Sequence, residues 1–210
     1  MSFAMRQQDR DIRSALKLVT PPAAEPVSRT EAKTHCRVDS DITADDTLID
    51  ALIVAARQHV EEFTGRALIT QTWDFKLETW PGYGEIVLPV APLVSVSSVS
   101  YRLEGGSVST LSSSAYIVDT DSDPGRLLLA AGESWPSDAL DPGPSVAVRF
   151  VAGYGAAGTA VPQTIRQAML LLIAHHYENR EAVIDTGRRT LLPVPLAVES
   201  LLFPYCIWGF

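Results

Sequence analysis

Apolar residues recur at every third or fourth position between Asp46 and Thr64, a spacing that places side chains on one face of an α-helix. The recurring positions are Leu48, Leu52, Ala55, Ala56, His59 and Phe63. Acidic residues begin this segment and Gly65 follows it, where a glycine can close a helix in the left-handed conformation. The pattern predicts a helix over residues 46–64, with this stripe packed against other helices.

Three further segments have helical signals. Ser28 and Glu31 have capping-box spacing, which predicts a short helix to about Cys36. Pro162 can occupy the first helical position of a segment that runs from Gln163 to Glu181 and is apolar nearly all round. Because a surface helix has one apolar stripe, we expect this one to be central in its own fold or shared with another subunit. Residues 182–192 are expected to form a loop, and Pro195 opens a short helix to Phe203.

Between residues 66 and 152 the apolar period changes from 3.6 to 2. Trp73, Phe75 and Leu77 alternate with charged residues, and the strand pattern that begins at Val94 shifts by one position at Ser98, as a β-bulge requires. Turn signals stand at 105–106 and 123–125, and a late strand is marked by Val146, Val148 and Phe150. These residues predict an antiparallel β unit of five to seven strands.

The predicted fold class is therefore α+β, with a helical core of about four helices, an inserted antiparallel β unit and an extended apolar C-terminal tail. Residues 1–27 are expected to form an N-terminal arm, with at most a short amphipathic helix from Asp9 to Leu18. Residues 28–65 are the first half of the helical part, 66–152 the β unit, 162–181 the central helix, and 193–210 the C-terminal helix and tail.

The tail is unusually apolar. Its large apolar side chains are Leu201, Leu202, Phe203, Tyr205, Ile207, Trp208 and Phe210. Left in water, this set would exceed the apolar patch that a soluble monomer usually exposes, so we expect it to dock on the protein's own core or on a partner. Pro193 and Pro195 precede it, and we expect it to move away from the core without unfolding the chain.

Composition and charge narrow the function. The 210 residues carry a net charge of −8, and residues 38–64 hold one basic and seven acidic side chains. This acidity argues against binding driven by phosphate neutralisation, but it allows DNA to pass nearby without binding. The two cysteines, Cys36 and Cys206, are far apart and indicate neither a disulfide framework nor a zinc site. No apolar stretch is long enough to cross a bilayer, so no membrane partner is expected.

Candidate chemistry is sparse. His175, His176 and Glu178 do not have the spacing of a zinc-hydrolase motif. His35 and Cys36 are adjacent, and adjacent side chains on a helix point in different directions, so they do not form a nucleophile and its base. We therefore predict no catalytic residues, no metal and no cofactor. Two rival hypotheses stay open. A metal-dependent hydrolase would use the histidine pair, and a carbohydrate-binding or adhesive module would present Trp73, Trp80 and Trp135 as an exposed flat platform.

The order of several segments carries a family resemblance. They are the capped helix at 28–38, the helix ending VEEFTGRALITQTW at 60–73, the strand pair LPVAPLVSVSSV at 88–99, a Gly-Tyr-Gly turn and the helix at 161–181. Together they resemble the head-tail connector proteins of tailed bacteriophages, also called adaptor or head-completion proteins, and their counterparts in prophages and gene transfer agents. The resemblance covers roughly residues 27–205.

This resemblance implies a structural protein of the virion, made in the bacterial cytoplasm and placed at the head-tail interface. Family members form a ring, usually of twelve subunits, that binds the portal protein on one side and stopper or tail-completion proteins on the other. Double-stranded DNA passes through the ring without specific binding. C-terminal segments in the family reach toward the portal, so the resemblance makes the seven apolar tail residues the expected portal-binding site.

Overall fold

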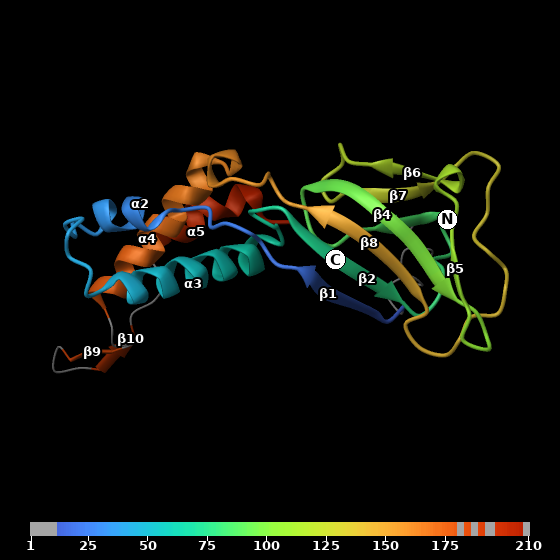
Figure 1. Cartoon of the computed structure of the whole chain (residues 1–210), viewed down its shortest axis with the longest axis horizontal. Coiled ribbons are helices and arrows are strands. Elements are labelled where there is room, and N and C mark those ends of the chain that lie inside the picture. The colour runs from blue at the N-terminus through green and yellow to red at the C-terminus, as the bar shows by residue number, and fades with distance from the viewer. Residues whose placement is uncertain (1–11, 180–182, 186–188, 192–195, 208–210) are drawn as a thin grey trace. The chain divides into compact units, whose positions relative to one another are not determined.

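The computed structural model describes residues 12–179, 183–185, 189–191 and 196–207 (Figure 1). The chain divides into two compact units. Of the described residues, the β unit contains 12–21 and 70–153, and the helical unit contains 22–69 and those that follow residue 153. The mixed α+β class, with antiparallel sheets and about four helices, is confirmed for the part of the chain that the structure describes.

The helical unit is built around α4 (Gln163–Glu178), which packs against α2 (Arg29–His35), α3 (Asp46–Thr64) and α5 (Leu196–Leu202). The buried residues Ile165, Ala168, Met169, Leu172 and Ile173 place α4 at the centre of the core. The central position expected for this helix is therefore confirmed. Residues 182–192 were expected to be a loop, but Val183–Asp185 (β9) and Arg189–Leu191 (β10) pair as antiparallel strands.

The predicted caps explain where α2 and α3 begin and end. Ser28 accepts a hydrogen bond from the Glu31 amide at 3.2 Å, and Glu31 Oε2 accepts one from the Ser28 amide at 2.9 Å, which completes the capping box. Gly65 closes α3 with a φ of 71°, a left-handed conformation that costs glycine little.

The face of α3 that meets the core differs from the predicted one. Its buried residues are Ile49, Ile53, Ala56, Arg57, Val60 and Thr64, so Ala56 alone of the predicted stripe is buried. Ala55, His59 and Phe63 are exposed, whereas Leu48 and Leu52 are half-buried. The prediction failed because α3 has two apolar rows with the same helical spacing, and periodicity cannot tell which row the other helices cover.

The β unit contains two antiparallel sheets. The larger has the order β1 (Ser14–Thr20), β2 (Gln71–Leu77), β8 (Val146–Ala152), β4 (Leu93–Arg102) and β5 (Val108–Thr110). The smaller has the order β3 (Glu85–Val87), β7 (Arg126–Leu129) and β6 (Tyr116–Asp119). Residues 66–152 therefore supply seven strands, within the predicted five to seven. The residue opposite Trp73 on β8 is Phe150, so the alternation in both strands builds one apolar sheet face.

Two local predictions in the β unit are confirmed. The pairing of β4 with β8 shifts register between Val96 and Ser98, where the sequence predicted a bulge. Gly105 and Gly106 have φ values of 95° and 85° and turn the chain from β4 into β5. Gly125 also requires its small size, because a Cβ there would lie 2.4 Å from the Cβ of Leu93.

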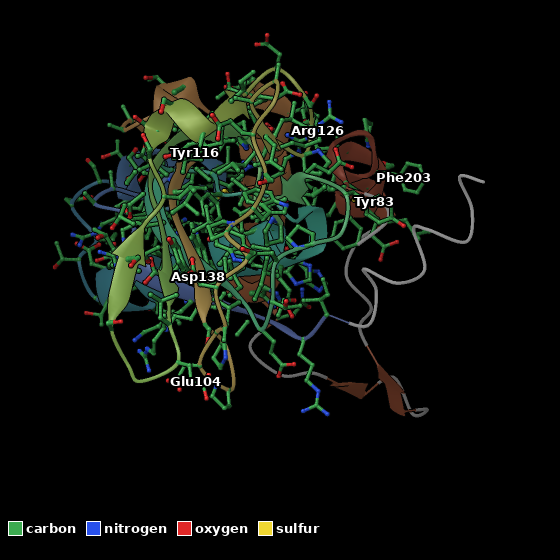
Figure 2. The ribbon with its side chains drawn as sticks, turned by 90° about the vertical axis from the view of Figure 1, so that its right-hand side faces the viewer. Tyr83, Glu104, Tyr116, Arg126, Asp138 and Phe203 are labelled. Atoms are coloured by element: carbon green, nitrogen blue, oxygen red, sulfur yellow. The ribbon has the colours of Figure 1, made fainter. Side chains whose placement is uncertain are left out.

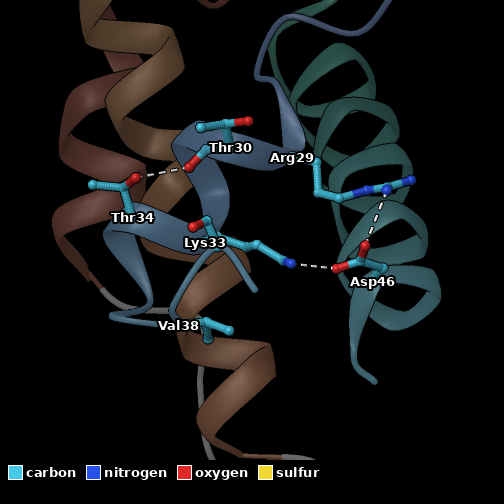
Figure 3. A pocket seen from close by; sticks show the side chains of 7 residues that line it. Arg29, Thr30, Lys33, Thr34, Val38 and Asp46 are labelled. Atoms are coloured by element: carbon cyan, nitrogen blue, oxygen red, sulfur yellow. Dashed lines mark hydrogen bonds and ion pairs between the residues drawn. The ribbon is translucent and has the colours of Figure 1, made fainter. Parts of the chain in front are cut away.

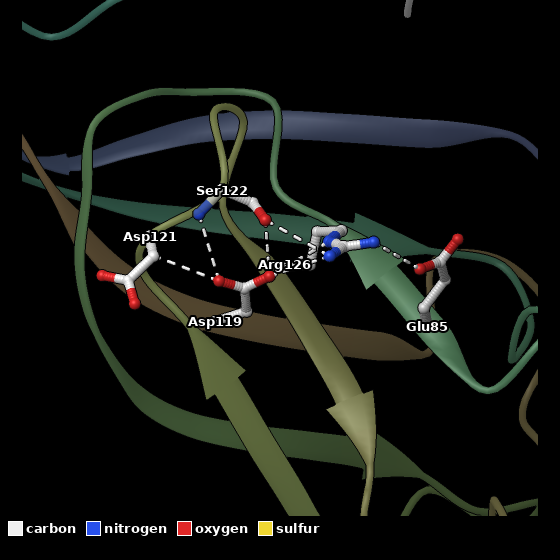
Figure 4. A network of polar contacts seen from close by, with 5 residues as sticks. All are labelled: Glu85, Asp119, Asp121, Ser122 and Arg126. Atoms are coloured by element: carbon white, nitrogen blue, oxygen red, sulfur yellow. Dashed lines mark hydrogen bonds and ion pairs between the residues drawn. The ribbon is translucent and has the colours of Figure 1, made fainter.

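The turn between β6 and β7 is held by a polar network (Figure 4). Asp119 accepts hydrogen bonds from the backbone amides of Asp121 and Ser122, both at 3.1 Å, and from Ser122 Oγ at 2.6 Å. Arg126 donates to Asp119 Oδ2 at 2.9 Å and reaches Glu85 of β3 at 3.4 Å. The hydrogen bonds from Ser122 and Arg126 hold the pKa of Asp119 well below its ordinary value.

The expected N-terminal helix is wrong where the structure describes it. Residues 14–20, predicted as part of an arm with at most a helix from Asp9 to Leu18, form strand β1 at the edge of the larger sheet. Leu16 and Leu18 lie opposite Phe75 and Trp73 of β2 and extend its apolar face. Leu16, Lys17 and Leu18 alternate with period 2, but a strand this short is recognised only when its partner strand is known. Residues 1–11 lie outside the described part.

Candidate partner-binding surface

The C-terminal segment of the helical unit has an inward and an outward face. On the inward face of α5, Val198 and Leu202 are one helical turn apart and are 0% and 1% exposed. On the outward face, Leu196 is 81% exposed and Phe203, seven residues later, is 60% exposed. Phe203 begins the short 3-10 helix η4 (Phe203–Tyr205) and is labelled in Figure 2. Two large apolar side chains thus face solvent from a segment fixed to the core.

The seven tail residues predicted to bind a partner do not act as one group. Leu202 belongs to the hydrophobic core of the helical unit, and Leu201 and Tyr205 pack partly against that core. Ile207 is half-buried and lies beside Gly65: its Cβ is 3.5 Å from the point where a Cβ on Gly65 would stand. Phe203 alone of the five described residues is mainly exposed. Trp208 and Phe210 lie outside the described residues.

Backbone contacts hold the segment against the end of α3. The Ile207 amide donates to Thr64 O at 3.0 Å, and Arg66 Nε donates to Tyr205 O at 2.6 Å. Residues 201–207 therefore dock on the protein's own helical unit, one of the two alternatives that the sequence left open. The prolines before α5 gave no sign of this, because the restraint comes from residues distant in sequence.

Leu196 is the outward residue that the sequence analysis missed. It precedes Phe203 by seven positions, or two helical turns, so both side chains lie on one side of α5 and η4. That spacing was visible in the sequence. The dense apolar run that begins at Leu201 hides this spacing, because the run contains residues of both helix faces.

Part of the acidic stretch at 38–64 is neutralised by arginine and lysine side chains, which pair with Asp46, Asp50 and Glu61. Asp46 lies 3.1 Å from Arg29 and 2.5 Å from Lys33, and all three residues line a hollow of about 260 Å³. Figure 3 shows both ion pairs. Arg29 also pairs with Asp50, and its hydrogen bond lowers the pKa of that carboxyl. The buried Arg57 pairs with Glu61 at 2.8 Å.

The acidic side chains of this stretch that remain exposed are Asp39, Asp41 and Glu62. The surface that could repel DNA is thus smaller than the charge count suggests.

The residues considered for catalysis and metal binding lie near the C-terminal ends of α2 and α4. His175 and His176 meet edge to face, with ring centroids 5.4 Å apart, on the last turn of α4. Burial raises the pKa of the Cys36 thiol, which disfavours the reactive thiolate. Within the described ranges, no three His, Cys, Asp or Glu side chains gather as a metal ion would require.

The tryptophans do not form the platform that a carbohydrate-binding module would present. Trp80 stacks on Trp135 with centroids 4.8 Å apart and planes 9° apart, and Tyr101 meets Trp80 edge-on at 5.5 Å. Trp80 and Trp135 lie one on top of the other, so each indole covers one face of its neighbour. The two rings therefore do not lie side by side as a flat platform requires. Trp73 belongs to β2 and pairs in register with Phe150.

Comparison with known proteins identifies relatives of both units. Residues 30–121 match the model of the phage gp6-like head-tail connector protein family. A search of curated proteins gave no match. No helix of the described ranges is long and apolar enough to cross a membrane.

Three similar solved structures come from gene transfer agent particles. A chain in the neck of the empty particle, computed with C6 symmetry, has a TM-score of 0.77 and 25% identity, covering 93% of this chain and 97% of that one. A chain in the native virion has a TM-score of 0.75, 25% identity and coverage of 93% and 96%. A chain in the native neck, computed with C12 symmetry, has a TM-score of 0.70, 25% identity and coverage of 93% and 97%.

Proposed function

Because residues 30–121 match the model of the phage gp6-like head-tail connector family, we propose that this chain is a connector of that kind and links the portal protein to the stopper and tail-completion proteins of its particle. It is a structural adaptor of the head-tail interface. The observation that carries this function is the similarity to gene transfer agent neck proteins, which spans 93% of this chain and therefore includes both units. A shared helical motif alone would not give that coverage.

The proposed assembly is a ring of identical subunits, twelve in number, with DNA passing through it. The neck structures computed with C6 and C12 symmetry support a ring, and the C12 structure supports the number. Asp39, Asp41 and Glu62 are exposed and are our candidates for carboxylates that face the passing DNA and repel it. Class averages of negatively stained necks would give the subunit number directly.

The outward face of α5 and η4 is our candidate for the portal contact. Leu196 and Phe203 supply exposed apolar area, and burying each could contribute about 1.5 to 3 kcal/mol before the ordering cost. A ring presents the contact many times, so a modest contact on each subunit becomes strong for the whole assembly. Trp208 and Phe210, which follow Phe203 in the chain, remain candidate portal-binding residues in this proposal. Leu201, Leu202, Tyr205 and Ile207 support the segment from the core side.

The test compares Phe203→Ser with Ile117→Ser, because Ile117 is 56% exposed but lies on β6. We expect both variants to melt like the wild type and Phe203→Ser alone to lose binding to purified heads that carry the portal. A chain ending at Ile207 tests Trp208 and Phe210 in the same assay. Normal head binding by Phe203→Ser and by the shortened chain would contradict the portal assignment.

The adaptor role requires no catalytic step. Metal analysis of protein purified without a histidine tag tests this directly, because the rival hydrolase would need a bound ion. We expect less than stoichiometric zinc and no change in metal content in His175→Ala. Stoichiometric metal that disappears in His175→Ala would favour the hydrolase hypothesis instead.

A further inference from the structure

Strand β1 forms the longest open edge in the β unit. It has seven residues, whereas β5, at the other edge of the same sheet, has three. The edge strands of the smaller sheet, β3 and β6, have three and four residues. Every residue of β1 is exposed, and no strand of the described residues pairs with its second edge (Figure 1). An open edge of this length is unusual, because its backbone groups can pair with another chain.

The pairing of β1 with β2 shows which backbone groups face the open edge. The Glu78 amide donates to Arg13 O at 3.3 Å, just before the first residue of β1. Hydrogen-bonded and non-hydrogen-bonded residue pairs alternate along an antiparallel ladder, so Ala15 and Lys17 also direct their backbone groups at β2. The residues between them direct their amides and carbonyls at the open edge, up to the register shift that ends the regular ladder: Ser14, Leu16 and Leu18. A strand on that side would find a ready row of hydrogen-bond partners.

The apolar face of the sheet continues to this edge and ends there uncovered. Leu16 is 42% and Leu18 is 40% exposed, although both lie opposite aromatic residues of β2, Phe75 and Trp73. Neighbouring strands cover one another's side chains where these lie side by side. Because β2 supplies that cover on one side only, apolar side chains from a strand on the open side would remove Leu16 and Leu18 further from water.

The other face of β1 is basic at the same edge. Lys17 lies opposite Asp74, and Lys76 extends from the same face of β2 as Asp74. Arg149 binds Asp74 at 2.7 Å and is the main cause of its lowered pKa, to which Lys76 and Lys17 contribute less. No described residue forms an ion pair with Lys17 or Lys76.

The other charges near this edge offset one another. Arg13 lies across the ladder from Glu78, and Asp74 is bound by the arginine of β8. Lys17 and Lys76 therefore remain as excess positive charge, in a protein whose net charge is −8. An acidic side chain beside Lys17 would meet a complementary charge.

We propose that the open edge of β1 binds an extended segment of another protein of the particle, which joins the larger sheet as an additional strand. The segment alternates apolar residues, which pack beside Leu16 and Leu18, with acidic residues, which lie beside Lys17. Backbone hydrogen bonds to the open edge hold it, and the alternating side chains select it. This inference rests on the proposed function, because an adaptor binds other proteins of its particle.

A second copy of β1 is a poor occupant of the same edge. Two paired β1 strands would place two copies of Lys17 on one face with no carboxylate between them, and a lysine on an edge strand opposes such self-pairing. Pairing of identical strands is also two-fold symmetric, whereas the subunits of a ring contact one another head-to-tail.

Leu16→Pro tests the backbone of the edge, because proline lacks the amide that Leu16 directs away from β2. Val108→Pro is the matched control. Val108 is 64% exposed on β5, at the other edge of the same sheet. Its amide also faces away from its partner strand, because the opposite residue, Arg102, directs its own amide at Ser145 O. Lys17→Glu tests the charge, and Lys17→Arg, which keeps the charge, is its control.

Each full-length variant is mixed with separately purified heads and tails from particles that lack this protein. The measurements are the melting temperature of the free protein, the fraction of heads joined to tails, and amide hydrogen exchange of β1 in the free protein and in joined particles. We expect exchange in wild-type β1 to slow at least about tenfold on joining, as pairing of its open edge requires. Leu16→Pro and Lys17→Glu should lower the joined fraction at least about tenfold, because the ring repeats the loss on every subunit.

The controls Val108→Pro and Lys17→Arg should join heads to tails like the wild type, and the two proline variants should melt within about 4 °C of one another. Normal joining by Leu16→Pro and Lys17→Glu would overturn the inference, as would an equal loss in the controls or unchanged exchange of β1 in joined particles. If Leu16→Pro does not fold, Lys17→Glu against Lys17→Arg decides. Slowed exchange in the free protein that increases with its concentration would assign the edge to a second copy and also overturn the inference. If the wild type itself does not join heads to tails, the proposed function fails, and that result is distinct from the others.

Discussion

The larger sheet and helix α3 each have one face that the core does not cover, and the two faces differ in chemistry. On the sheet, Lys17 lies opposite Asp74, which Arg149 of the next strand binds at 2.7 and 2.9 Å. The outer face of α3 is mostly uncharged, with Glu62 as an exposed carboxylate near its C-terminal end. Hydrated charges make covering a surface costly, so the sheet face, with its paired charges, is the better suited of the two to remain in water.

The same two regions also differ in how strongly sequence specifies a face. In a strand, alternation assigns each residue to one side, and an error of one residue reverses the whole assignment. Trp73 and Phe75 were placed correctly on one side of β2 for this reason. In α3 the apolar residues cover more than half of the helix circumference, and the choice between Ile53 and Ala55 as core residues is left to packing.

The largest effect is expected from a charge in the centre of the helical core. Leu172 of α4 is 1% exposed, and Leu172→Asp places an unpaired carboxylate where no cation can reach it. We expect a loss of several kcal/mol in the free energy of unfolding, enough to abolish cooperative melting. A soluble Leu172→Asp protein with near-wild-type melting would show that α4 is not central.

The second prediction separates the two faces of the C-terminal segment. Leu202→Ala should cost about 2 to 5 kcal/mol of unfolding free energy, because it leaves a cavity in the core. Phe203→Ala, at the next residue, should change stability by no more than about 0.5 kcal/mol, since its side chain is mainly exposed. Urea denaturation of both variants measures the difference. Equal stability losses would mean that Phe203 belongs to the core as well.

Deleting residues 201–210 should therefore destabilise the protein. The deletion removes Leu202 from the core together with the hydrogen bonds of Tyr205 and Ile207 to the region around α3. The sequence alone predicted instead that the tail could move away from the core without unfolding the chain. Near-wild-type melting of the deletion variant would show that the tail does not contribute to the stability of the isolated protein.

A smaller effect with a defined pH dependence is expected at the β6–β7 turn. The pKa of Asp119 is lowered in the folded protein, so its ionised form stabilises the fold above its unfolded pKa of about 3.9. We expect the melting difference between wild type and Asp119→Asn to be constant from about pH 7 to 5 and to shrink as the pH falls below about 4. A difference that grew on acidification would contradict the network in Figure 4.

The smallest effect is expected on the outer face of the sheet. Arg149 and Asp74 form a two-bond ion pair, but Arg149 is about half exposed, and water screens such pairs. Arg149→Ala should change the unfolding free energy by about 1 kcal/mol or less and leave head binding unchanged. A loss of head binding would show that this charged face also contacts a partner.

Sequence by itself determined which segments of the chain form most of the regular structure. The capping box at Ser28, the left-handed Gly65 and the register shift near Ser98 are local events, set by the conformational preferences of a few adjacent residues. The family resemblance likewise depended on the order of such segments along the chain, and so it pointed to the connector family without knowledge of their contacts.

Only the tertiary structure decided which faces are covered. β1 became a strand because β2 offers a matching apolar edge, and α3 buries Ile53 rather than Ala55 because of the helices that pack on it. Leu202 and Phe203 are adjacent, yet one lies in the core and the other is exposed. Whether a side chain is buried depends on residues distant in the chain. The hydrophobicity of a residue indicates only that its transfer out of water is favourable, and it does not indicate which surface the residue packs against.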